Sequence, residues 1–241
     1  MRKFFLSAFV LAASLAVAST GMALEKSAAR FADDSRDGWS AGGTTCSVAY
    51  YNICTGWIWV WSGWSAGDVV GTQFDTCSGG PCTLDSGFMY FTTGAPSGYG
   101  FTGSAAVNAG DVNGCPTGAP LASQAFLPIS GWNLLTWGVS VPSSYVISVE
   151  FAASQGLPNP AAMATEHPAA GPTGPAACGT CYPTNRTNHS FYFGTSGSPL
   201  CPGSALNDGV CDAQLLFDSQ LAGCTVSVED TSWGTVKNLY R

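Results

Sequence analysis

The sequence predicts an all-β protein, an antiparallel β-sandwich of the jelly-roll kind with one long loop and a short C-terminal helix. Short segments rich in Val, Phe, Tyr, Trp and Thr alternate with clusters of Gly, Pro, Asn and Asp, which is the pattern of strands joined by turns. No long stretch has the 3.6-residue apolar period of a helix, and many short strands are typical of sandwiches and barrels. Ten cysteines add a disulfide framework.

Residues Met1–Ala23 read as a secretory signal peptide. Arg2 and Lys3 precede an apolar run that ends in small residues before a cleavage site. This run is shorter than a membrane-spanning helix, and the first cysteine, Cys46, is too far from the expected cut to carry a lipid. We therefore expect a secreted protein, extracellular or periplasmic, without a membrane span.

The mature chain is expected to be acidic and poor in charge. Loss of Arg2 and Lys3 from the 8 basic residues leaves 6 against 15 acidic ones. A surface with so few cations cannot neutralise phosphates, which argues against nucleic acid and anionic membranes as partners. A glycan or a cell-surface or matrix protein is the class of partner that this composition leaves open.

After a polar leader at 24–43, the sandwich domain is predicted to extend from 44 to 230. Its centre is a Trp-rich hairpin, in which Trp57, Trp59 and Trp61 alternate with apolar residues. The predicted strands are 44–52, 56–61, 68–75, 87–92, 98–107, 123–127, 134–141, 145–152, 189–195, 213–219 and 224–229.

Two segments depart from the strand pattern. Residues 154–186 carry six prolines among Ala and Gly, and we interpret them as a long loop pinned by Cys178 and Cys181. Near the end of the chain, apolar residues recur at steps of three. This spacing favours a short helix at 231–241 that docks one apolar stripe on the sandwich.

An even number of cysteines in an exported chain predicts disulfide bonds. Each bond would stabilise the fold by roughly 2–4 kcal/mol, because it restricts the unfolded chain. The sequence leaves the connectivity open. Pairing of cysteines that are close in sequence predicts Cys46–Cys54, Cys77–Cys82, Cys178–Cys181 and Cys201–Cys211, and leaves Cys115–Cys224.

The signal peptide, the Trp-rich hairpin and the Cys-rich loops are followed by the ending Trp233-Gly234-x-x-Lys237-x-Leu239-Tyr240-Arg241. In these features the chain resembles uncharacterised secreted bacterial β-sandwich proteins that are rich in Cys and Trp. The resemblance covers most of the mature chain. It implies export and a sandwich, and it implies no activity.

Residues 63–67, Gly-Trp-Ser-Ala-Gly, match the nucleophile elbow of hydrolases, in which a strand-to-helix turn exposes the serine. A strand pattern follows Ser65, and the same five letters recur at 38–42, so a hairpin turn is the favoured interpretation. His167 and His189 follow Ser65 in the order that a catalytic triad would need. Their sequence contexts favour a loop residue and a strand-edge residue, respectively.

The patterns for metal and redox sites are weak. Cys178 and Cys181 lie among prolines, which favours a disulfide over a redox pair or half of a zinc site. Asp208 and Asp212 flank a turn and could lend oxygens to calcium, but Asn-Asp-Gly at this place also suits a tight turn. We expect no cofactor and no metal.

The tryptophans allow two interpretations. Trp57, Trp59 and Trp61 would share one face of a strand, where packing between two sheets is favoured over a platform that stacks on sugar rings. Trp64 lies at the turn and is therefore the candidate for an exposed binding contact.

These observations favour a non-catalytic, disulfide-stabilised surface, matrix or ligand-binding module over an enzyme. One alternative is a carbohydrate-binding module that uses an exposed Trp. The other is a secreted hydrolase that uses Ser65 or a pair of acidic residues, which glycoside cleavage requires on two sides of a cleft.

Overall fold

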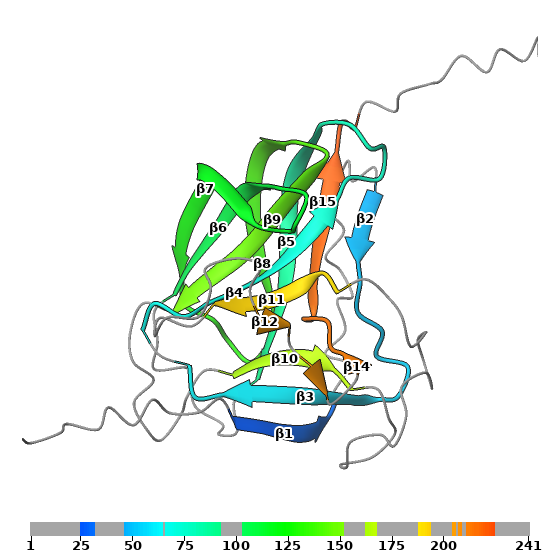
Figure 1. Cartoon of the computed structure of the whole chain (residues 1–241), viewed down its shortest axis with the longest axis vertical. Helices are drawn as coiled ribbons and strands as arrows, with labels where there is room; N and C mark the ends of the chain where they lie inside the picture. The colour runs from blue at the N-terminus through cyan, green and yellow to red at the C-terminus, as the bar shows by residue number, and fades with distance from the viewer. Residues whose placement is uncertain are drawn as a thin grey trace, which may run out of the picture.

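The computed structural model describes residues 25–31, 46–64, 66–92, 103–151, 162–167, 188–193, 204–205, 207–208 and 211–224. This part of the chain is all-β and contains no helix. Two antiparallel sheets pack face to face around one main core (Figure 1). The predicted β-sandwich is thereby confirmed at the level of its two-sheet architecture. The predicted signal peptide, the predicted C-terminal helix at 231–241 and the last predicted strand lie outside the described residues, except for Cys224.

The larger sheet has seven strands: β1 (Glu25–Arg30), β3 (Trp57–Ser62), β10 (Ala162–Glu166), β5 (Cys82–Thr92), β15 (Phe217–Ala222), β2 (Cys46–Ala49) and β8 (Gly131–Val141). Strand β5 is its centre. One side of β5 pairs with β8, and the other side is shared end to end by β15 and β10. In Figure 1, β1, β3 and β10 accordingly cross the lower part of the view, whereas β15 and β2 stand upright.

The smaller sheet has six strands: β12 (Ser204–Ala205), β11 (Ser190–Phe193), β4 (Val69–Asp75), β9 (Ser144–Phe151), β6 (Gly103–Gly110) and β7 (Pro116–Phe126). A short ribbon pairs β13 (Asn207–Asp208) with β14 (Cys211–Asp212). Most of these strands overlap segments in which the sequence predicts strands, because β-branched and aromatic residues fit a half-buried pleated surface.

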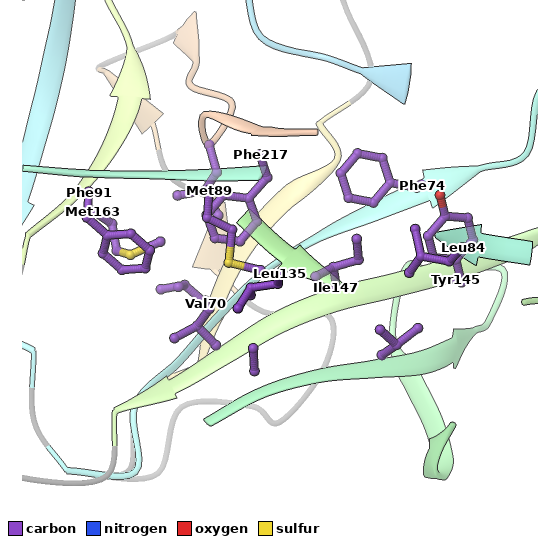
Figure 2. Packing of buried hydrophobic residues seen from close by; sticks show 14 of the residues in the cluster. Val70, Phe74, Leu84, Met89, Phe91, Leu135, Tyr145, Ile147, Met163 and Phe217 are labelled. Carbon is purple, nitrogen blue, oxygen red and sulfur yellow. The ribbon is translucent and has the colours of Figure 1, made fainter. Parts of the chain in front are cut away.

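The main core fills the space between the two sheets. In Figure 2, Phe74 and Tyr145 from the six-stranded sheet lie near Leu84 of β5, and Phe91 lies beside Met163 of β10. These side chains are at most 1% exposed. Burying each large side chain of this kind contributes about 1.5–3 kcal/mol, so the contact between the sheets is the main source of stability.

The predicted Trp-rich hairpin is wrong, although both of its strands exist. β3 belongs to the seven-stranded sheet and β4 to the six-stranded sheet, and they do not pair with each other. The turn between them is tied to the far end of β9. Gly67 donates its N–H to the carbonyl of Phe151 at 2.6 Å, and Phe151 donates its N–H to the carbonyl of Asp68 at 2.9 Å.

Two strands lie in segments that were predicted to lack them. β10 occupies residues 162–166 of the predicted long loop, and it is inserted between β3 and β5. β1 occupies 25–30 of the predicted polar leader and pairs along the whole of β3. Neither segment has a strong intrinsic strand pattern, so both become strands because a neighbouring edge supplies hydrogen bonds and burial.

Two disulfides in the described region connect strands that are distant in sequence. Cys46 at the start of β2 pairs with Cys77 after β4, and Cys82 at the start of β5 pairs with Cys224 after β15. The predicted Cys46–Cys54, Cys77–Cys82 and Cys115–Cys224 bonds are therefore wrong. The register explains the second bond, because Ala222 lies opposite Thr83 and the two chains continue side by side to Cys224 and Cys82.

The remaining cysteines fall into two groups. Cys54 and Cys115 are also disulfide-bonded. Cys178, Cys181 and Cys201 lie outside the described residues, as does the side chain of Cys211. The disulfides are compatible with an oxidising extracellular or periplasmic environment. No helix within the described ranges is long and apolar enough to cross a membrane.

Candidate functional site

The seven-stranded sheet carries a second apolar cluster on the face that points away from the main core. Successive side chains of a strand point to opposite faces, so Ile58 and Tyr90 lie on this outer face while Trp59 and Met89 lie in the core. We call this set the outer-face cluster. Its buried members are Ile58, Tyr90, Ala164 and Leu216, and its partly buried members are Ala29, Phe31, Tyr51, Ile53, Val60 and Trp132.

Four aromatic rings of the outer-face cluster form a continuous row. The ring centroids of Phe31 and Tyr90 are 5.3 Å apart, those of Tyr90 and Trp132 are 5.3 Å apart, and those of Trp132 and Tyr51 are 5.8 Å apart. Tyr90 is buried at the centre, whereas the other three rings are partly exposed. Such a row offers flat apolar surface together with the polar tips of Tyr and Trp.

The loop between β2 and β3 is held over the end of the seven-stranded sheet by three hydrogen bonds. The Tyr51 hydroxyl donates to Oδ2 of Asp218 at 3.4 Å, and the Asn52 N–H donates to Oε2 of Glu166 at 2.5 Å. Thr55 donates its hydroxyl to the carbonyl of His167 at 2.9 Å. The loop thus places Tyr51 at one end of the aromatic row.

Two buried carboxylates stabilise this arrangement. Glu166 is 0% exposed and Asp218 is 1% exposed. Besides the N–H of Asn52, Glu166 accepts the N–H of Gln214 on its other oxygen at 2.9 Å. A buried carboxylate needs such donors to offset its lost hydration. The observed partners of the Glu166 carboxylate are backbone N–H groups of two separate segments, which is the arrangement of a structural anchor.

A polar chain continues from Glu166 to the six-stranded sheet. The side-chain oxygen of Gln214 accepts the N–H of His189 at 3.1 Å. The His189 ring lies parallel to the Tyr50 ring, with centroids 3.6 Å apart. The Asp75 N–H donates to the Tyr50 hydroxyl at 3.1 Å. Burial raises the pKa of Tyr50, an effect that the Asp75 N–H partly opposes.

Two further groups have shifted pKa values. Burial raises the pKa of Tyr145 well above its usual value, and its hydroxyl donates to Ser219 at 2.7 Å inside the core. The pKa of Asp111 is lowered, chiefly because its carboxylate accepts the N–H of Cys115 in the β6–β7 turn. Both shifts come from groups that hold the fold together, so neither singles out a catalytic residue.

The structure overturns the predicted exposure of Trp64. This side chain is 1% exposed, its indole N–H donates to the carbonyl of Trp61 at 2.9 Å, and its ring stacks on Phe151 with centroids 5.1 Å apart. The turn must cross from one sheet to the other, and the large ring of Trp64 fills the space at that crossing. Trp64 therefore cannot serve as the exposed contact that the sequence suggested.

Core packing is confirmed for two tryptophans of β3. Trp59 is 6% exposed and Trp61 is 9% exposed, and both belong to the main core. Trp57 at the start of β3 remains partly exposed. The guanidinium carbon of Arg30 lies 4.8 Å from the centre of the Trp57 ring, a cation–π contact that β1 brings into place.

Ser65 itself lies outside the described residues. Its surroundings are clear, because Trp64 before it is buried and the chain after it continues into strand β4. A nucleophile elbow requires a helix at that place. The context of the motif is therefore that of a crossing between sheets.

The two histidines occupy different places in the fold. His167 is 0% exposed and stacks on Trp59, with ring centroids 4.2 Å apart. His167 directly follows β10. The expectation of a solvated loop residue at this position is wrong, because the side chain is buried. His189 comes directly before β11, as the predicted strand-edge position requires. The backbones of Asp208 and Asp212 lie in the β13–β14 ribbon, but their side chains lie outside the described residues.

Sequence reasoning missed the aromatic row. The sequence did not identify Trp132 at the start of β8 or Tyr51 after β2 as binding candidates. The two-residue alternation of a strand shows which side chains share one face of a sheet. It does not show whether other parts of the chain cover that face. Within the described ranges, no group of His, Cys, Asp and Glu side chains could hold a metal ion.

Comparison with known proteins yields no relative for this chain. No protein-family model matches it, and neither the curated proteins nor the solved structures contain a significant match.

Proposed function

We propose that the protein is a secreted, non-catalytic module that binds a ligand or a surface through the outer face of its seven-stranded sheet. The aromatic row of Phe31, Tyr90, Trp132 and Tyr51 is the observation that carries this proposal. Three of its four rings are partly exposed on one face. Aromatic groups that are left accessible together, and are rimmed by polar residues, are typical of interaction sites.

The strand order supports a jelly roll as the scaffold of this module. Strands β3 to β10 pair in the orders β3–β10–β5–β8 and β4–β9–β6–β7. Consecutive strands cross between the two sheets at every connection except β6–β7. An eight-stranded double sheet wound in this way is the arrangement of a jelly roll, which also occurs in lectins.

Several features of the chain suit a secreted protein. The predicted signal peptide, the disulfides and the low content of charged residues suit a protein that works outside the cytoplasm. In that setting a rigid sandwich with an accessible aromatic face can act on a cell surface or in a matrix.

Covalent labelling tests the non-catalytic assignment against the hydrolase alternative. The folded protein and its Ser65→Ala variant would be incubated with a fluorophosphonate probe, and the labelled fraction would be measured by mass spectrometry. We expect no labelling of either protein. Labelling of the wild type that disappears in Ser65→Ala would overturn the assignment and establish Ser65 as a nucleophile.

Carbohydrate binding is a second candidate function, and the position of Trp132 favours it. Its partly exposed indole lies between Tyr90 and Tyr51 in the row, and a flat ring of this kind can stack on a sugar. A glycan array with the wild type, Trp132→Ala and Trp57→Ala would test it. We expect Trp132→Ala to abolish binding and Trp57→Ala, which removes another partly exposed Trp of the same sheet, to retain it. Equal loss in both variants would exclude a sugar site at Trp132.

A further inference from the structure

Charge is distributed very unevenly along this chain. Between Asp85 and Glu150 the only charged residue is Asp111. This interval contains most of β5 and β9 and all of β6, β7 and β8. The four large apolar side chains that are most exposed among the described residues also lie in it. They are Val112 at 99%, Leu121 at 41%, Leu127 at 64% and Ile129 at 63%.

Strand β7 is a long edge strand of this uncharged region. It lies at the end of the six-stranded sheet and, within the described ranges, pairs with β6 alone. Exposed edges invite pairing with another chain, and proteins usually block them with charge, proline, bulges or short strands. The sequence of β1 contains three charged residues, and β2 and β12 have only four and two residues. By comparison, β7 and the other long edge strand, β8, each have 11 residues and no charge. Of these two strands, β7 is the one with exposed leucines on it and beside it, namely Leu121 and Leu127.

Only the first half of β7 is blocked. The pairing with β6 jumps from Ala109 opposite Thr117 to Val107 opposite Ala122, so residues 118–121 bulge out and include Pro120. From Ala122 to Phe126 the pairing is regular again. Ser123 and Ala125 are exposed in this half, and Gln124 donates its side-chain amide to the carbonyl of Thr136 on β8 at 3.2 Å. This stretch is therefore ordered, uncharged and accessible.

We propose that the second half of β7 is a self-association edge whose partner is β7 of a second copy of this chain. An antiparallel pair centred on Gln124 places Leu121 opposite Leu127 of the second copy, and Ser123 opposite Ala125 of the second copy. This pairing buries exposed leucines against each other and is self-complementary, as a two-fold dimer requires. It does not depend on the ligand-binding proposal.

The net charge of the protein limits where a second copy can bind. Acidic residues exceed basic ones by 15 to 8 over the whole sequence, so two copies repel each other through most of their surfaces. The β7 edge is a place where two copies can meet without that repulsion. A single strand pair buries less than the roughly 1,200 Å² of a standard interface, so the dimer is expected to be weak and concentration-dependent.

Sedimentation equilibrium over a wide concentration range tests this edge. The wild type would be compared with Ala125→Lys, Ala125→Glu and an equimolar mixture of the two. Like charges on the facing strands should weaken dimerisation about tenfold or more in each variant alone. In the mixture, opposite charges meet across the axis and dimerisation should return to at least the wild-type level.

Two further variants make the outcome unambiguous. Ser27→Lys adds the same charge to an exposed position of the β1 edge and should leave dimerisation unchanged. Leu127→Ser changes an exposed side chain outside the strand and should weaken dimerisation without unfolding, as checked by circular dichroism. A wild type that stays monomeric at every concentration would overturn the proposal, and so would a dimer that Ala125→Lys and Leu127→Ser leave intact.

Discussion

Glu166 and Gln214 are joined by two hydrogen bonds. The N–H of Glu166 donates to the carbonyl of Gln214 at 3.1 Å, and the N–H of Gln214 donates to Oε1 of the Glu166 side chain at 2.9 Å. The other oxygen of Glu166 accepts the N–H of Asn52. One buried side chain therefore fixes β10, the segment before β15 and the loop that carries Tyr51 of the aromatic row.

Replacement of Glu166 by Gln should destabilise the protein by about 1–3 kcal/mol. The amide keeps the size of the side chain but retains only one acceptor oxygen, so either the buried N–H of Gln214 or the partly buried N–H of Asn52 loses its partner. Chemical denaturation of the wild type and Glu166→Gln would measure the difference. Glu150→Gln, at an exposed position of β9, is the matched control and should change stability by less than about 0.5 kcal/mol. Equal stability of both variants would contradict the anchoring role of Glu166.

Removing the Cys82–Cys224 bond should cost more stability than removing the Cys46–Cys77 bond. The two bonds span 142 and 31 residues, respectively. Restriction of the unfolded chain is worth about 5 kcal/mol for the longer loop and about 4 kcal/mol for the shorter one. Thermal unfolding of the two Cys→Ala double variants would measure the order, and the reverse order would contradict it.

Reduction of the wild type should lower its melting temperature steeply, whereas a metal chelator should have little effect. The Cys46–Cys77 bond connects the two sheets, and the Cys82–Cys224 bond connects neighbouring strands of the seven-stranded sheet. Loss of both bonds removes these constraints on the unfolded chain. Calorimetry with a thiol reductant and, separately, with a chelator would separate the two effects. Unfolding caused by the chelator alone would reveal a structural metal.

Gly71→Ala should destabilise the protein by about 1–3 kcal/mol, because the new methyl group would overpack a filled site. A Cβ atom at Gly71 would lie 2.9 Å from Cε2 of Phe191 and 3.1 Å from the carbonyl oxygen of Ile147. The double variant Gly71→Ala/Phe191→Leu removes the ring that clashes. The double variant should lose less unfolding free energy than the sum of the losses in the two single variants, as a double-mutant cycle in denaturant would show. Strict additivity would mean that the Phe191 ring does not restrict Gly71.

Tyr145 should make stability fall at alkaline pH. Burial raises its pKa in the folded state above the unfolded value of about 10. The unfolded protein then releases this proton first, so the contribution is fully present below pH 10 and decreases as the pH rises further. Unfolding free energies measured from pH 8 to 11 should fall less steeply for Tyr145→Phe than for the wild type. At neutral pH the variant should lose about 1 kcal/mol, because the buried Ser219 hydroxyl loses this partner.

Local patterns were enough to locate most of the strands and part of the core. Trp59 and Trp61 alternate with Ile58 and Val60, and this period of two places the first pair in the main core and the second pair on the outer face. Such alternation is a property of the strand itself. It does not depend on which other strand lies next to it, so it can be recognised in the sequence alone.

Pairing between distant segments could not be predicted in the same way. Trp64 looked exposed because it lies in a turn, and it is buried because that turn crosses between sheets beside Phe151. Ala162–Glu166 looked like a loop, and it is a strand because β3 and β5 offer it hydrogen bonds on both sides. Cys224 pairs with Cys82 because β15 lies along β5.

The sequence by itself determined an all-β, cysteine-rich chain with tryptophans in its core, because composition and the two-residue period depend only on neighbours along the chain. The tertiary structure alone decided which cysteines form disulfides, that Trp64 is buried, and which aromatic rings form a row. These outcomes depend on the order and register of strands in the two sheets, and contacts between residues that are distant in the sequence determine that order.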